Sequence, residues 1–127
     1  MFAEKKGIKL IDINSNIRNF GESRKISIYF LHGLILAGVA LMLGFEKTFI
    51  PTSLTYDELF PWGSHPITDP LWGIENREII HDGADCSRSN KIQFISQFPE
   101  VLDNLQVCWG NIDHNCGSCS KCLRTRA

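Results

Sequence analysis

The chain has 127 residues, which is the size of one domain. Hydrophobic residues make up 43% of it and charged residues 21%, a balance that excludes an intrinsically disordered or low-complexity chain. The net charge of -1 carries no basic excess, so nucleic-acid binding driven by phosphate neutralisation is not expected.

The first third of the chain predicts a strand, a helix and a second strand. Residues 8–13 alternate between apolar and polar side chains, as a half-buried strand does. Residues 26–43 are mostly apolar and predict a helix buried on several sides, with Gly44 at its C-cap. Residues 47–50 predict a second strand, so the spacing is that of a βαβ unit with a parallel sheet.

A cytoplasmic location without membrane association is expected. Polar residues and glycines interrupt the apolar run at 26–43, which leaves it short of a spanning helix. No signal peptide opens the sequence.

Neither end carries a linker rich in Gly, Ser or Pro, and residues 123–127 begin a helix that stops within a turn. We therefore expect the chain to be part of a larger domain.

The middle of the chain predicts a long loop followed by a strand and a helix. Residues 51–76 hold four of the five prolines, and a loop of this length usually has a function. Residues 77–81 predict a third strand, and residues 87–98 predict a helix. In the turn between them, Asp85 or Ser87 is expected to cap the helix, and anion binding by the free backbone N–H groups is the alternative. The predicted fold class is therefore α/β, with a partial, Rossmann-like parallel sheet.

Most of the cysteines cluster near the end of the sequence, at Cys108, Cys116, Cys119 and Cys122. Their C-x7-C-x2-C-x2-C spacing lets neighbouring thiolates face one ion while the short segments between them turn. Four thiolates suit Zn²⁺ in a closed tetrahedral site, which leaves no position for a catalytic water. The sequence therefore predicts a structural zinc ion held by these four cysteines in a C-terminal knuckle.

Other interpretations of the cluster stay open. An iron–sulfur cluster is the main alternative, although the Cys-Pro ending of the bacterial ferredoxin motif is absent. His114 could replace one sulfur as a ligand. Disulfides are disfavoured because no secretory signal is present. Cys86 lies far from the cluster along the chain and is predicted to be a small buried residue.

The cysteine cluster followed by Arg124 resembles the C-terminal zinc motif of the 7-cyano-7-deazaguanine synthases. Those enzymes are PP-loop ATP pyrophosphatases with an α/β fold of the adenine nucleotide alpha-hydrolase type. Residues 87–109, a predicted helix with Lys91 that leads to Val-Cys-Trp, are similar to that family's approach to its zinc site. Residues 56–66 and 115–125 also resemble the C-terminal half of other PP-loop relatives. The resemblance covers most of the chain, and the zinc motif is its most specific part.

The resemblance implies a division of the chain and an activity. Residues 1–107 would be a partial α/β domain of the PP-loop type, and residues 108–127 the zinc-binding segment. Family members use ATP and Mg²⁺ to adenylate a small substrate, and they release pyrophosphate. Their Ser-Gly-Gly-x-Asp-Ser phosphate loop is absent from this sequence, so the chain is expected to be inactive alone. In the complete form the expected partners are ATP and a small-molecule substrate, with self-association left open.

Two other functions remain as alternatives to this enzyme. One is a non-enzymatic zinc-binding module that binds a protein or a nucleic acid through its knuckle and basic tail. The other is a sulfur-transfer relative that holds an iron–sulfur cluster. Metal content distinguishes the second alternative, and salt-sensitive retention on nucleic acid distinguishes the first.

Candidate catalytic residues lie in the long loop. His65 has the hydroxyl of Ser64 beside it and the carboxyl group of Asp69 four residues later. Such a set could perform acid–base or substrate-orienting work, or it could only stabilise a turn.

Candidate cofactor-binding residues follow two of the predicted strands. Thr52 and Ser53 come directly after the second strand, and ligands of parallel sheets gather at such strand ends. Gly83 and Ala84 belong to the turn whose backbone N–H groups could hold an anion.

The remaining histidines and tryptophans have structural interpretations. His32 is predicted to be a core histidine of the apolar helix, and His81 is expected to pair with its neighbour Asp82. Trp62 and Trp72 could stack on a base, or they could anchor the long loop on the core.

Overall fold

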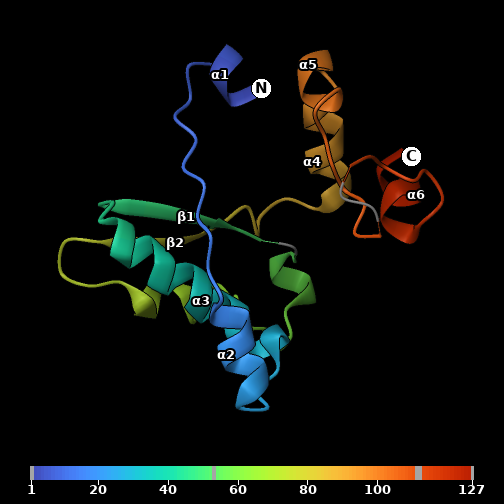
Figure 1. Cartoon of the computed structure of the whole chain (residues 1–127). Coiled ribbons are helices and arrows are strands. Elements are labelled where there is room, and N and C mark those ends of the chain that lie inside the picture. Colours follow the sequence, from blue (N-terminus) through green and yellow to red (C-terminus); the bar gives the residue numbers. More distant parts are fainter. Residues whose placement is uncertain (1, 53, 111–112, 127) are drawn as a thin grey trace. The chain divides into compact units, whose positions relative to one another are not determined.

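A computed structural model of the chain describes residues 2–52, 54–110 and 113–126. In these residues the fold mixes helices with a small sheet of two parallel strands (Figure 1). The chain forms two units. Ile13–Arg88 is the sheet unit, and Met1–Asp12 together with Ser89–Ala127 is the cysteine unit. The predicted boundary between residues 107 and 108 falls inside the cysteine unit and stays a prediction.

Helices make up most of the regular structure in both units. The sheet unit contains α2 (Ile17–Ser23), α3 (Ile28–Leu43), β1 (Lys47–Pro51) and β2 (Glu78–Asp82), with 3-10 turns at Tyr56–Glu58 and Asp69–Trp72. The cysteine unit contains α1 (Phe2–Lys5), α5 (Pro99–Leu102), α6 (Ser120–Arg126) and all but the first residue of α4 (Arg88–Ile95). Across the described ranges, no helix combines the length and the apolar character that a membrane crossing requires.

The longest helix, α3, is defined by residues at its two ends. The Ser27 side chain accepts a hydrogen bond from the backbone N–H of Tyr29, at 3.3 Å, which satisfies one of the free donors of the first turn. At the other end Gly44 adopts a left-handed conformation with φ 78°, and its N–H donates to the carbonyl of Leu41. The predicted helix at 26–43 and its glycine C-cap are thus confirmed.

The core of the sheet unit lies between α3 and the sheet. Ala37 and Ala40 of α3 pack with Ile50 of β1 and Ile79 of β2, and none of the four is more than 5% exposed. The prediction that α3 is buried on several sides is wrong, because large apolar side chains on its other faces are exposed, Met42 by 79%. A two-stranded sheet covers only one stripe of a helix, and small residues at that stripe let the helix approach closely.

The two strands pair in parallel, with Lys47 opposite Glu78 and Pro51 opposite Asp82. The predicted second and third strands are therefore confirmed, but the strand predicted at residues 8–13 is wrong. That segment is irregular and exposed in the structure. Alternation of side chains gives a strand one apolar face, yet a strand forms only where a partner supplies hydrogen bonds. Consequently the described part of the chain contains a parallel pair and not a full Rossmann-like sheet.

A close approach of two glycines fixes the long loop on α3. The N–H of Gly63 donates to the carbonyl of Tyr29 at 2.9 Å. A Cβ added at Gly33 would lie 2.8 Å from the Cα of Ser64, so only glycine fits at this crossing. The Trp62 ring packs on Tyr29, with centroids 5.3 Å apart, so it attaches the loop to α3. This contact places Ser64 beside the ends of the strands.

Candidate metal centre

The four clustered cysteines converge in the structure. The sulfur atoms of Cys108, Cys116, Cys119 and Cys122 all lie within 4.8 Å of one another. Cys116 Sγ lies 3.9 Å from Cys122 Sγ, and Cys119 Sγ lies 4.0 Å from Cys108 Sγ. All four are free thiols. Ideal tetrahedral zinc–sulfur bonds of about 2.3 Å place the sulfurs about 3.8 Å apart, so this set could hold one metal ion.

Local structure explains how α6 and the turn before it aim three of these sulfurs. Gly117 adopts a left-handed conformation with φ 75°, which turns the chain directly after Cys116. The backbone N–H of Cys119 points at Cys116 Sγ at 3.4 Å, and the N–H of Cys122 points at Cys119 Sγ at 3.5 Å. Each C-x2-C step therefore forms a small turn in which a backbone N–H faces the preceding sulfur.

These N–H groups also determine which thiols lose their protons easily. Hydrogen bonds from the backbone of Ser118 and Cys119, with the Ser118 hydroxyl, lower the pKa of Cys116 to about 5. The backbone N–H of Cys122 lowers the pKa of Cys119 in the same way. Burial instead raises the pKa of Cys122 to about 11, and its side chain is almost completely buried. The cluster thus combines Cys116, which readily becomes a thiolate, with Cys122, which must lose a proton before it can bind a metal ion.

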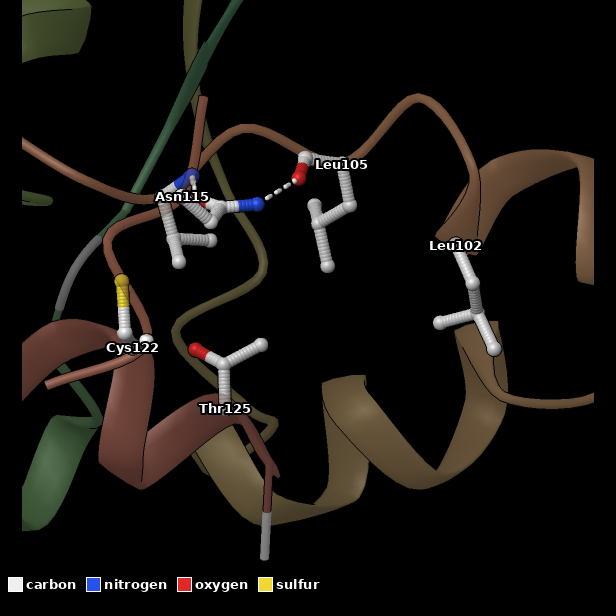
Figure 2. A pocket seen from close by; sticks show the side chains of 7 residues that line it. Leu102, Leu105, Asn115, Cys122 and Thr125 are labelled. Atoms are coloured by element: carbon white, nitrogen blue, oxygen red, sulfur yellow. Dashed lines mark hydrogen bonds between the residues drawn. The ribbon is translucent and has the colours of Figure 1, made fainter. Parts of the chain in front are cut away.

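Asn115 holds the segment of Cys108 against the rest of the cluster. Its Oδ1 accepts hydrogen bonds from the N–H of Val107 at 2.9 Å and of Cys108 at 3.1 Å. Its Nδ2 donates to the carbonyl of Leu105 at 2.6 Å, the bond drawn in Figure 2. This role of Asn115 was not predicted from the sequence, although its position directly before Cys116 was a usable signal. One side chain therefore sets the separation of the first cysteine from the other three.

A pocket of about 280 Å³ lies beside the cluster within the cysteine unit. Figure 2 shows Cys122 and Thr125 of α6 on one side of it, with Asn115 above Cys122, and Leu102 of α5 on the other, with Leu105 between the two sides. Cys122, which is 2% exposed, thus lines a pocket formed by residues of its own unit.

Two other sulfur or nitrogen candidates stay outside the cluster. Among the described residues, the group that could hold a metal consists of the four cysteines and does not include His114, which is exposed. Cys86 is exposed, so the prediction that it is buried is wrong. It lies at the turn before α4, where its N–H donates to the carbonyl of Gly83.

The predicted catalytic residues come together only in part. Ser64 Oγ donates to Asp69 Oδ2 at 2.6 Å, and both residues are buried. His65 joins them only through its backbone: its N–H donates to Asp69 Oδ1 at 3.1 Å, and its carbonyl accepts from the N–H of Asp69 at 2.9 Å. Its ring accepts a hydrogen bond from the N–H of Ile67, as in a local turn. The expected pairing of His81 with Asp82 is wrong, because His81 Nδ1 lies 2.7 Å from Asp69 Oδ2.

The predicted cofactor-binding residues are engaged in local structure. Thr52 follows β1, and its hydroxyl bonds to both the N–H and the carbonyl of Leu54. Ser53 lies outside the described residues. Gly83 follows β2 with φ 78°, and the carbonyl of the buried Ala84 accepts from the N–H of Tyr56 at 3.0 Å. Anion binding at this turn stays a prediction.

His32 differs from its prediction as a core residue. Its ring is half-buried, lies against Trp62 with centroids 5.3 Å apart, and bonds through Nδ1 to the carbonyl of Tyr29. The ring thus belongs to the contact between α3 and the long loop, where it packs on the loop and not in the core.

Comparisons of the chain with protein-family models, with curated proteins and with solved structures find no match. The site therefore has to be interpreted from its own geometry.

Proposed function

We propose that the four cysteines hold one zinc ion with a structural role. The observation that carries this proposal is the convergence of the four sulfurs, all within 4.8 Å of one another. Four thiolates complete the coordination of zinc, so no position is left for a substrate or a catalytic water. An iron–sulfur cluster distributes its four cysteines over two or four iron atoms, which places at least some of the sulfurs farther apart than around one ion.

The ion would join segments that have little else to stabilise them. Helix α6 has seven residues, fewer than an isolated helix needs to be stable in water. Cys119 and Cys122 lie on or next to α6, whereas Cys108 lies before the loop that leads to it. Binding of one ion to both segments would couple metal affinity to folding of this part of the cysteine unit.

We further propose that this zinc-binding segment belongs to a PP-loop ATP pyrophosphatase-like enzyme, similar in its zinc motif to 7-cyano-7-deazaguanine synthase. The resemblance of residues 108–124 supports this proposal, and the parallel pairing of β1 with β2 is compatible with it. In the complete form, ATP with Mg²⁺ would adenylate a small substrate. The chain lacks the Ser-Gly-Gly-x-Asp-Ser loop, so it should release no pyrophosphate from ATP by itself.

The metal proposal is tested by elemental analysis of protein purified without oxygen, combined with counting of reactive thiols. We expect about one zinc per chain, no iron and no acid-labile sulfide. Alkylation of the folded protein should modify Cys86, which is exposed, and modify the four ligands only after chelation. Iron with sulfide would favour the sulfur-transfer alternative, and a metal-free protein with five reactive thiols would refute the proposal.

A matched pair of variants separates metal binding from general damage. Cys119→Ser removes one sulfur of the cluster, whereas Cys86→Ser removes an exposed thiol outside it. The first variant should lose its zinc and the second should retain it. Equal zinc content in both would show that the metal binds elsewhere.

An exposed aromatic residue favours the interaction module as a second candidate function. Trp109 follows Cys108 directly and is 77% exposed, with Lys121 Nζ only 3.2 Å from the centre of its ring. An exposed indole ring with a cation beside it could bind single-stranded nucleic acid, because a base can stack on the ring and the cation can contact a phosphate. Retention of the zinc-loaded chain on single-stranded RNA that falls with salt, and is lost in Trp109→Ala, would support this function over the enzyme.

A further inference from the structure

The sheet unit contains a buried polar cluster that the metal centre does not use. Asp69 is fully buried, and three groups surround its carboxyl oxygens: the hydroxyl of Ser64, the N–H of His65 and Nδ1 of His81. The carboxylate can accept a hydrogen bond from each of these groups. Acceptance from Nδ1 holds the imidazole of His81 in one orientation and in the tautomer that carries its proton on Nδ1.

The other ring nitrogen of His81 finds no partner in the described part of the chain. Its side chain is only 3% exposed, and Nε2 has no hydrogen-bond partner among the residues that the structure describes. In the tautomer set by Asp69, the neutral ring presents a lone pair at Nε2. Buried polar atoms are nearly always hydrogen-bonded, so an unpaired buried nitrogen such as Nε2 indicates that another group binds there.

A small cavity adjoins the ring at the carboxyl ends of both strands. It has a volume of about 90 Å³, and His81 and Ser64 supply polar groups to its wall. Leu36, Leu54 and Trp62 make much of the rest of the wall apolar. None of its described lining residues carries a permanent charge, and the negative Asp69 lies directly behind His81. In open parallel sheets this edge is where ligands bind.

We propose that this cavity binds a small neutral group that has a hydroxyl or amide N–H donor on an apolar stem, with Nε2 of His81 as the acceptor. The volume is about three times that of a water molecule, which admits roughly four or five non-hydrogen atoms. An anion is disfavoured because the described lining residues include no lysine or arginine and Asp69 would repel it. Asp69 acts as the positioning residue, since it fixes which nitrogen of His81 accepts.

The test uses two probes of the same size on the full-length chain labelled with ¹⁵N-histidine. 2-Propanol has an O–H donor, whereas acetone has the same carbon skeleton and only an acceptor. Addition of 2-propanol should move the Nε2 resonance of His81 along a saturable curve, with the resonance assigned through His81→Gln. Acetone should bind at least about fivefold more weakly, because it leaves Nε2 unpaired. The resonances of His65 and His114 should not follow the curve.

Two outcomes would overturn the proposal. Equal displacement by both probes would show a solvent effect without recognition of a donor, and no displacement by either would show that the cavity excludes such ligands or holds only water. Asp69→Asn supplies a second readout in the same spectra. Loss of the carboxylate should redistribute the ring proton between Nδ1 and Nε2 and abolish the discrimination between the probes. Retention of both the tautomer and the discrimination would exclude the positioning role of Asp69.

Discussion

The crossing of α3 and the long loop can be tested with two alanine substitutions in α3. Alanine at one glycine should raise the free energy of unfolding, and alanine at the other should lower it. Substitution of alanine for glycine inside a helix stabilises it by about 1 kcal/mol when the new methyl group meets nothing. Gly38 meets this condition, since no atom lies within 4 Å of an added Cβ. Gly33 does not, since its Cβ would lie 2.8 Å from Ser64 Cα and closer still to the carbonyl of Gly63.

The magnitude at Gly33 follows from what the methyl group would strike. Both neighbours are backbone atoms, which cannot rotate away as a side chain would, so α3 and the loop have to separate. Overpacking of this kind costs about 1–3 kcal/mol, and we expect the upper part of that range here. After subtraction of the gain of about 1 kcal/mol in helix propensity, Gly33→Ala should lose about 1–2 kcal/mol of stability. Gly38→Ala should gain up to about 1 kcal/mol.

Urea unfolding of the two variants, followed by tryptophan fluorescence, measures the difference in free energy of unfolding. Trp62 lies next to Gly63 and packs on α3, so its emission should also change in folded Gly33→Ala. Gly38→Ala controls for the general effect of alanine on the helix. A Gly33→Ala protein as stable as Gly38→Ala, with unchanged emission, would show that the loop does not cross α3 at this point.

Three further predictions concern the cysteine unit. Removal of the metal with a chelator should unfold α6, with a loss of helical circular dichroism that zinc restores and magnesium does not. Asn115→Ala should weaken zinc binding by about 10–100-fold in competition with a fluorescent chelator, because three hydrogen bonds that hold the Cys108 segment are lost, and an unchanged affinity would contradict that role. Zinc affinity should rise at least about tenfold per pH unit between about pH 6 and pH 8, because Cys122, with a pKa of about 11, must release a proton on binding. Cys116, with a pKa of about 5, is already deprotonated over this range and adds no further slope, and a flat profile would refute the assignment.

Features that depend on near neighbours in the chain could be predicted from the sequence. The end of α3 at Gly44 follows from a conformation that glycine adopts easily, and the cysteine spacing leaves the thiolates few geometries other than convergence. The strand at residues 8–13 fails for the opposite reason. Its alternation is a local pattern, but pairing depends on a second strand elsewhere in the chain, and none of the described residues supplies one.

The partner of His81 illustrates the same limit at a site. Its neighbour Asp82 is the obvious choice by position, yet successive residues of a strand point to opposite faces of the sheet. The ring instead reaches Asp69, twelve residues earlier, on a 3-10 turn whose position depends on the loop that crosses α3 at Gly33. Nothing in the composition of that loop indicates the crossing, because a glycine that permits a close contact looks in sequence like any other glycine.

The two candidate sites therefore differ in what assembles them. Asn115 reaches Leu105, Val107 and Cys108 within ten residues, so a short stretch of chain with one ion contains nearly all the information for the metal centre. The site at His81 draws on α3, both strands and the loop between them, and Ile50 belongs both to its cavity and to the core with Ala37, Ala40 and Ile79. A substitution in that core should alter the tautomer of His81 without contact with its ring, whereas the metal centre should respond mainly to changes within residues 105–125.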